Sequence, residues 1–148
     1  MPSGLLRQYA PDAIVSTVGS QTVTGYKEGT FVEAERTAET SSFDVGSDGE
    51  VTLIVNPNQS GTVKFTLQQS SPLNDYFNTL FQAIQQRNLS TGIVPLSVVD
   101  KSGTTVVNSK QAIIQKPAKV TFADKSEVRE WTFICPYLDI EVGGESSL

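Results

Sequence analysis

Alternation of apolar and polar residues runs through most of this chain, and it constrains the fold more than any other feature. In residues 61–68 (GTVKFTLQ) every second side chain is apolar, which is the pattern of a strand that buries one face. Strands are predicted at 13–18, 21–26, 30–37, 51–55, 61–68, 93–100, 104–108 with 111–115 as its extension, 119–123, 128–135 and 138–142. The expected fold class is mainly β, built from about ten short strands.

Residues 72–88 are the exception, because they follow the spacing of a helix. Ser71 can cap the first turn, Pro72 fits the first helical position, and Asp75 lies near the positive end of the helix dipole. Apolar residues then recur at intervals of three and four, which predicts one flanking α-helix that packs on the sheets. The predicted packing residues are Leu73, Tyr76, Phe77, Leu80, Phe81 and Ile84. A stripe at this spacing is more typical of core packing than of a ligand pocket.

The 148 residues are predicted to form a single domain with an extended N-terminal arm (1–12), a long polar hairpin or loop (37–50) and a short C-terminal tail (143–148). The polar segment is either a loose loop or a pair of strands that continue outward as a hairpin, with 51–55 as the return of 30–37. No apolar run approaches the roughly 20 residues of a membrane span. The N-terminal sequence lacks the features of a secretory signal, so we expect the protein to stay in the cytoplasm where it is made.

The residue types that most catalytic and metal sites need are missing. The chain has no His and a single Cys, which removes the usual transition-metal ligand sets and the Ser-His-Asp and Cys-His catalytic arrangements. We therefore expect no catalytic site, no metal, no cofactor and no enzymatic activity. Cys135 lies in a predicted strand with Trp131 and Phe133, and we expect it to be a small buried hydrophobe.

Two acidic features allow an alternative interpretation as sites. Glu33 and Glu35 share one face of a predicted strand, so they form either a carboxylate pair or a simple acidic surface, and no surrounding motif supports the pair. Residues 44–50 (DVGSDGE) place oxygen-bearing side chains near a glycine, as calcium loops do. The full spacing of such a loop and its flanking helices are absent, which favours a tight turn.

The net charge of −5 is concentrated in one segment. Residues 33–50 contain six acids against the single base Arg36, whereas acids and bases balance in the rest of the chain. Such a segment produces a directional field. Basic residues are scattered and do not alternate with aromatics, so a surface that grips nucleic acid is disfavoured.

Two long passages carry a resemblance to a known family. They are VGSDGEVTLIVNPNQSGTVKFTLQQSSPLNDYF (45–77) and KPAKVTFADKSEVREWTFICPYLDIEVGG (116–144). The order of an Asp-Gly-Glu turn, a Ser-Gly that opens a Thr-rich strand, a helix opened by Asn-Asp-Tyr, and later Lys-Pro-Ala, Arg-Glu-Trp and a closing Gly-Gly resembles the tail tube proteins of contractile-tailed bacteriophages. The resemblance covers most of the chain, and each motif alone is weak.

The resemblance implies a fold of two packed antiparallel β-sheets, a sandwich or barrel, flanked by the helix at 72–88. It also implies a structural virion protein, made in the cytoplasm of the host bacterium, that assembles as stacked hexameric rings into the phage tail tube. Double-stranded DNA would pass through the lumen without specific binding, and no membrane would be involved. The implied partners are further copies of the chain, the tail sheath, a tape measure protein, a baseplate hub and a tail terminator. The alternatives are a tube protein of a tailocin or type VI secretion system, and a small β-barrel binding module.

On this interpretation the acidic segment has two expected roles. Acidic walls keep DNA from sticking, so the candidates for lining the lumen are Glu33, Glu35 and Glu39. The segment that follows is expected to reach the next subunit or ring. Its candidate contact residues are Thr37, Glu39, Phe43, Asp44, Asp48 and Glu50.

Overall fold

The computed structural model describes residues 7–8, 14–23, 32–101, 103–125, 127–144 and 146–147. Its elements in chain order are β1 (Arg7–Gln8), β2 (Ile14–Val18), β3 (Gln21–Thr22), β4 (Val32–Arg36), β5 (Ser41–Val45), β6 (Val51–Val55), β7 (Gly61–Gln68), α1 (Leu73–Gln85), α2 (Leu89–Gly92), β8 (Val94–Asp100), β9 (Val106–Lys116), β10 (Val128–Cys135), β11 (Asp139–Glu141) and β12 (Ser146–Ser147). Eight strands join in the order β3-β2-β8-β9-β10-β7-β4, with β11 also on β9. β5 pairs only with β6, and β1 only with β12.

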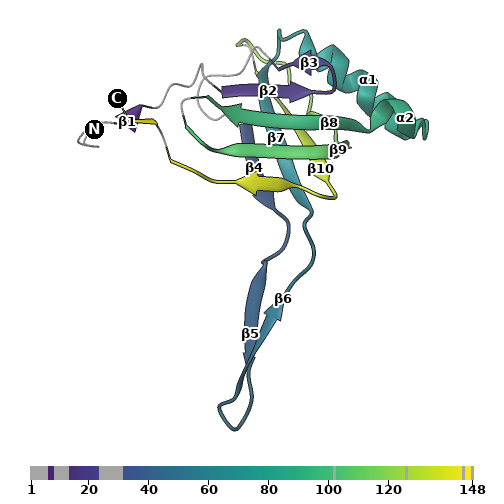
Figure 1. The fold of residues 1–148 in the computed structure, drawn as a ribbon. Coiled ribbons are helices and arrows are strands. Elements are labelled where there is room, and N and C mark those ends of the chain that lie inside the picture. The colour runs from purple at the N-terminus through teal and green to yellow at the C-terminus, as the bar shows by residue number, and fades with distance from the viewer. Residues whose placement is uncertain are drawn as a thin grey trace.

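The long strand β9 belongs to two antiparallel sheets (Figure 1). Its first half pairs with β8 and β11, and its last residues pair with β10. Val94 faces Ala112 while Leu96 faces Ser109, so β9 holds one extra residue in this stretch. Such a bulge bends a strand and lets it pass from one sheet to the other. The prediction of a mainly β chain with two antiparallel sheets and one main helix is confirmed.

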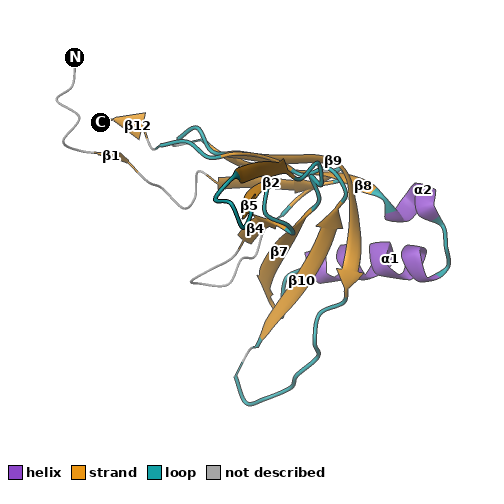
Figure 2. Ribbon diagram, turned by 90° about the horizontal axis from the view of Figure 1, so that it is seen from below, coloured by secondary structure: helices purple, strands orange, loops and turns teal. Residues whose placement is uncertain are grey.

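The core lies between the sheets and α1. Leu73, Phe77 and Leu80 of the helix are buried in it. The Phe77 ring centroid lies 5.8 Å from that of Phe65 on β7 and 5.2 Å from that of Phe133 on β10. The other three predicted packing residues, Tyr76, Phe81 and Ile84, are partly buried, and the first two pack against the core. Figure 2 shows α1 and α2 together at one end of the strands.

The helix begins and ends differently from its prediction. It starts at Leu73, whose N–H is donated to the Ser71 hydroxyl at 3.3 Å, and Pro72 occupies the cap position with helical dihedrals. It ends at Gln85, and Arg87 then adopts a left-handed φ of 61°. Residues just beyond the predicted end at 88 form the second, four-residue helix α2.

Two strand predictions are wrong. Residues 119–123 form no strand among the described residues, although their sequence alternates. Residues 51–55 do form β6, but they pair with β5, and the partner of β4 is β7. Alternation shows which side chains share a face and does not identify the neighbouring strand. Parts of the predicted strands 21–26 and 30–37 and most of the predicted arm 1–12 lie outside the described residues.

Two buried serines differ in how their hydroxyls are satisfied. The Ser16 Oγ on β2 has no hydrogen-bond partner among the described residues. The Ser109 hydroxyl donates a hydrogen bond to the Gln111 carbonyl at 2.9 Å and accepts one from the Gln111 N–H at 3.4 Å. We expect Ser16→Ala to raise the free energy of unfolding by about 1 kcal/mol, because it removes an unsatisfied buried group, and Ser109→Ala to lower it by a similar amount. Urea unfolding of both variants measures the difference, and a loss of stability in Ser16→Ala would contradict the assignment.

Asn74 joins the start of α1 to both neighbouring strands. Its Oδ1 accepts the Trp131 Nε1–H at 2.9 Å, and its Nδ2 donates to the carbonyls of Gln68 and Ser71, both at 3.0 Å. We expect Asn74→Ala to lower the free energy of unfolding by about 2 kcal/mol, because it leaves the buried Trp131 indole N–H without its partner. Trp131 is the only tryptophan, so its fluorescence follows the change directly. Thr79→Ala on an exposed turn of α1 is the matched control, and an equal loss there would contradict the assignment.

Candidate assembly surfaces

The segment predicted as a loop or outward hairpin is a hairpin. β5 and β6 project from the sheets as a two-stranded arm, well separated from the rest of the chain (Figure 1). Every described side chain from Glu39 to Gln59 is exposed. A two-stranded hairpin is marginally stable in water by itself. This arm therefore has the form of a segment that is completed by contact with another molecule.

The hairpin has one apolar and one largely polar face. Residues paired across an antiparallel ladder share a face, and Phe43 pairs with Leu53 and Val45 with Val51. Together with Val55 these side chains form what we call the apolar face of the hairpin. They are 58–67% exposed. The opposite face carries Ser42, Asp44, Thr52 and Ile54.

The hairpin is held in shape at its tip. The Gly46 N–H is donated to the Glu50 carbonyl at 2.7 Å, and the Glu50 N–H to the Asp48 carboxylate at 3.0 Å. Gly49 has a φ of 87°, a conformation that favours glycine. The predicted tight turn at DVGSDGE is therefore present, and Asp48 serves the turn with its own side chain.

The neck of the hairpin is also ordered. The Thr37 N–H is donated to the Ser60 carbonyl at 3.0 Å, which extends the β4–β7 ladder toward the hairpin. On the returning side Asn58 accepts from both the N–H and the hydroxyl of Ser60, at 3.0 and 2.7 Å. These bonds fix the direction in which the hairpin leaves the sheets.

A second surface is the outer face of β4, β7 and β10, opposite the core. Glu33 pairs with Lys64 and Glu35 with Thr62 across the β4–β7 ladder, and both glutamates are exposed. The structure thus brings Glu33 and Glu35 together on this face and places a lysine beside them. Glu39 lies apart from them, in the connection between β4 and β5.

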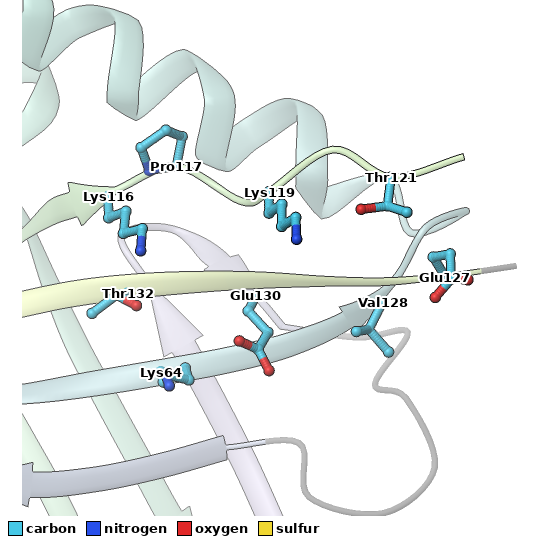
Figure 3. Close-up of a pocket in the computed structure, with 9 residues that line it drawn as sticks. All are labelled: Lys64, Lys116, Pro117, Lys119, Thr121, Glu127, Val128, Glu130 and Thr132. Atoms are coloured by element: carbon cyan, nitrogen blue, oxygen red, sulfur yellow. The ribbon is translucent and has the colours of Figure 1, made fainter. Parts of the chain in front are cut away.

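The same face continues into a hollow of about 400 Å³ between β10 and residues 116–121 (Figure 3). Lys116 and Lys119 project toward β10 from one side, and Glu130 points toward the strand that carries Lys64. The hollow is open and mixed in charge. It holds no arrangement of nucleophile and base.

Other sites for chemistry are lacking in the described part of the chain. No group of three or more potential metal ligands gathers there. Burial raises the pKa of the Cys135 thiol, and a hydrogen bond with Ser109 partly offsets this rise, so the reactive thiolate is disfavoured. None of the described helices has the length and apolar character to cross a membrane.

The apolar face of the hairpin is the feature that sequence reasoning missed. Residues 51–55 (VTLIV) are predicted as the return strand of 30–37 or as part of an outward hairpin, and neither prediction includes an exposed apolar face there. A signal was present in the segment SSFDV, because Phe43 and Val45 alternate with Asp44 as they would in a strand.

The described residues thus present two exposed surfaces, the apolar face of the hairpin and the polar outer face of the sheet, and an exposed apolar surface is typical of proteins that bind other proteins. Comparison with known proteins agrees, because the family described as "Bacteriophage PhiTE tail tube protein" matches residues 12–143. The chain belongs to this family of phage tail tube proteins. It is a structural protein of the phage tail tube family, and it is not an enzyme.

One phage protein is similar to the chain in sequence, and two solved structures are similar to it in fold. The chain is 24% identical over 152 residues to structural protein ORF10 of Pseudomonas phage KPP10, and the aligned region covers 99% of this chain and 88% of that protein. Its fold is similar to a chain of the anti-feeding prophage tube-terminating cap, with a TM-score of 0.62, 12% identity and 95% of both chains covered. It is also similar to a chain of the extended sheath–tube complex of the PVC extracellular contractile injection system, with a TM-score of 0.58, 12% identity, and 93% of this chain and 94% of that chain covered.

Proposed function

We propose that this chain forms hexameric rings that stack into the tail tube of a phage particle, and that the hairpin makes the contact between copies. The observation that carries the proposal is the exposed apolar face of the hairpin. A patch of this kind on an isolated subunit marks an interaction surface. Covering it with a second copy removes apolar area from water, which stabilises both the hairpin and the assembly.

The candidate contact residues take different parts in this contact. Phe43 lies in the apolar face, and Asp44 lies on the opposite face of the same strand. Asp48 and Glu50 form the tip, while Thr37 and Glu39 lie at the neck. The expected contact is therefore an apolar centre with an acidic rim, which is the arrangement common in protein interfaces.

The outer face of β4, β7 and β10 is proposed to line the lumen. β4 ends the path of paired strands among the described residues, so its outer edge is proposed to pair with a neighbouring copy and close the ring. Glu33 and Glu35 then face the DNA. Lys64 opposite Glu33 compensates part of their charge within the subunit. DNA slides past such a wall because few cations are left for its phosphates.

The proposed partners are the tail sheath outside the tube, a tape measure protein inside it, a baseplate hub below and a terminator above. Similar folds occur in a sheath–tube complex and in tube terminators of contractile injection systems. The likeness to terminators supports a second candidate function, in which the chain forms one ring that ends a tube. We place synthesis in the cytoplasm of the bacterial host.

Negative-stain electron microscopy and light scattering of the purified protein at high concentration test the proposal. Tubes with a stain-filled channel, formed alone or on added tail tips, are the expected result. Single rings that cap such tips without growing would instead favour the terminator. A monomer that stays monomeric with tail tips present would overturn the assembly role and favour the binding module.

A further inference from the structure

The described residues carry a second exposed apolar surface, on the connection between β9 and β10. Val120 is 64% exposed and Phe122 is 80% exposed. Ala118 anchors this connection by packing against the core, and the Arg129 guanidinium lies 5.8 Å from the centre of the Phe122 ring. We call residues 118–123 the receiving segment. Their alternating sequence is that of a strand, yet they pair with no strand among the described residues.

The receiving segment and the hairpin lie at opposite ends of the subunit. β7 starts at Gly61, beside the neck of the hairpin, and ends at Gln68, which pairs with Val128 at the start of β10. The connection that enters β10 is thus at the far end of this ladder, about 25 Å away by the usual rise per residue of a strand. Figure 1 shows the hairpin pointing away from that end. Complementary surfaces at opposite ends make a head-to-tail contact that repeats along an axis.

The charges around the two surfaces are complementary. Residues 37–56 contain four acids and no base. Residues 116–125 contain three lysines against one acid, Asp124. Such complementarity sets the orientation in which two surfaces meet and raises the rate at which they associate. Two hairpins meeting each other would instead bring like charges together, so a contact between hairpins is disfavoured.

We infer that the apolar face of the hairpin of one copy docks on Val120 and Phe122 of the next copy along the tube. Lys125 then lies near the acidic rim of the docked hairpin, and Lys116 and Lys119, whose side chains line the hollow, add positive charge at longer range. The inference rests on the proposed stacking of copies and adds the surface that receives the hairpin. Each copy offers one hairpin and one receiving segment, so the contact extends without limit along the axis.

Two variants that each remove one half of the contact test it. The hairpin variant carries Phe43→Asp and Leu53→Asp, and the receiving variant carries Val120→Asp and Phe122→Asp. Each alone is expected to stop at a small species of defined mass, either monomer or single ring. When the two preparations are mixed, intact hairpins of one meet intact receiving segments of the other. The mass measured by light scattering should then double and grow no further.

Control variants place one aspartate on the other side of each segment. The first is Ser42→Asp, because Ser42 lies on the opposite face of β5. The second is Thr121→Asp, because Thr121 lies between Val120 and Phe122 in sequence but lines the hollow. Both are expected to elongate like the original chain. Circular dichroism of all variants checks that they fold, which is expected because every altered residue is exposed.

The outcomes separate this inference from the proposed function. If the original chain elongates and the receiving variant elongates equally, or if the mixture keeps the mass of its components, the docking on the receiving segment is wrong and the tube assignment stands. If the original chain fails to elongate even on tail tips, both the docking inference and the proposed tube function are wrong. A paired charge exchange, Glu50→Lys with Lys125→Glu, should restore elongation that either change alone slows, and failure of this rescue would remove the assigned orientation.

Discussion

A chain in which residues 39–58 are replaced by Asn-Gly should fold as before and should no longer elongate. The Thr37 N–H and the Ser60 carbonyl already form a bonded pair at 3.0 Å, so a two-residue turn joins the strands at this point without altering β4 or β7. β5 and β6 pair only with each other, so little of the core is disturbed. The free energy of unfolding should change by no more than about 0.5 kcal/mol, as for surface changes in general.

Urea unfolding followed by Trp131 fluorescence measures the first half of this result, and electron microscopy on added tail tips measures the second. The shortened chain keeps Gln59, whose carbonyl accepts the Leu138 N–H at 2.9 Å, so the core beside the neck stays tied. Normal tubes from the shortened chain would show that the hairpin is not the contact between copies. A large loss of stability would show that the hairpin serves the fold of its own subunit.

The sequence predicted well those elements whose pattern depends on burial within the subunit. The alternation at 61–68 marks β7, whose Val63, Phe65 and Leu67 are fully buried, and the stripe after Pro72 marks α1. Contacts between distant segments were not predictable. The hydrogen bond from Trp131 to Asn74 joins residues 57 positions apart, and neither residue type indicates the other as its partner.

The candidate site was predictable in charge and not in shape. Acidic residues at 33–50 can be counted in the sequence, but their separation into a sheet face with Glu33 and Glu35 and a neck with Glu39 depends on where β4 ends. The sequence predicts strands at 51–55 and 119–123, but their apolar residues do not show whether they are buried inside a subunit or between subunits. Both segments carry exposed apolar side chains in the isolated chain, and both enter the proposed contact.

Phe77→Ala should be the most destabilising single change in the subunit, with a loss of about 3 to 5 kcal/mol in the free energy of unfolding. The Phe77 side chain is fully buried, and its ring centroid lies 5.7 Å from that of Trp131 and 5.2 Å from that of Phe133. Its removal leaves a cavity where helix and sheets meet. A domain of this kind has a total stability of about 5 to 15 kcal/mol, so the variant keeps only a small margin at best.

The partly buried Phe81 lies one turn further along α1, and Phe81→Ala provides the matched control. It removes the same side chain from a site that is partly open to water, so a loss of only about 1 to 2 kcal/mol is expected there. Urea unfolding followed by circular dichroism compares the two variants independently of any direct change at Trp131. Equal losses would mean that α1 packs less tightly at Phe77 than its ring contacts indicate. At urea concentrations below its lowered unfolding midpoint, the Phe77→Ala variant is expected to fold with its hairpin and receiving segment unchanged. Its folded fraction should still elongate, because core packing and assembly use separate surfaces of this chain.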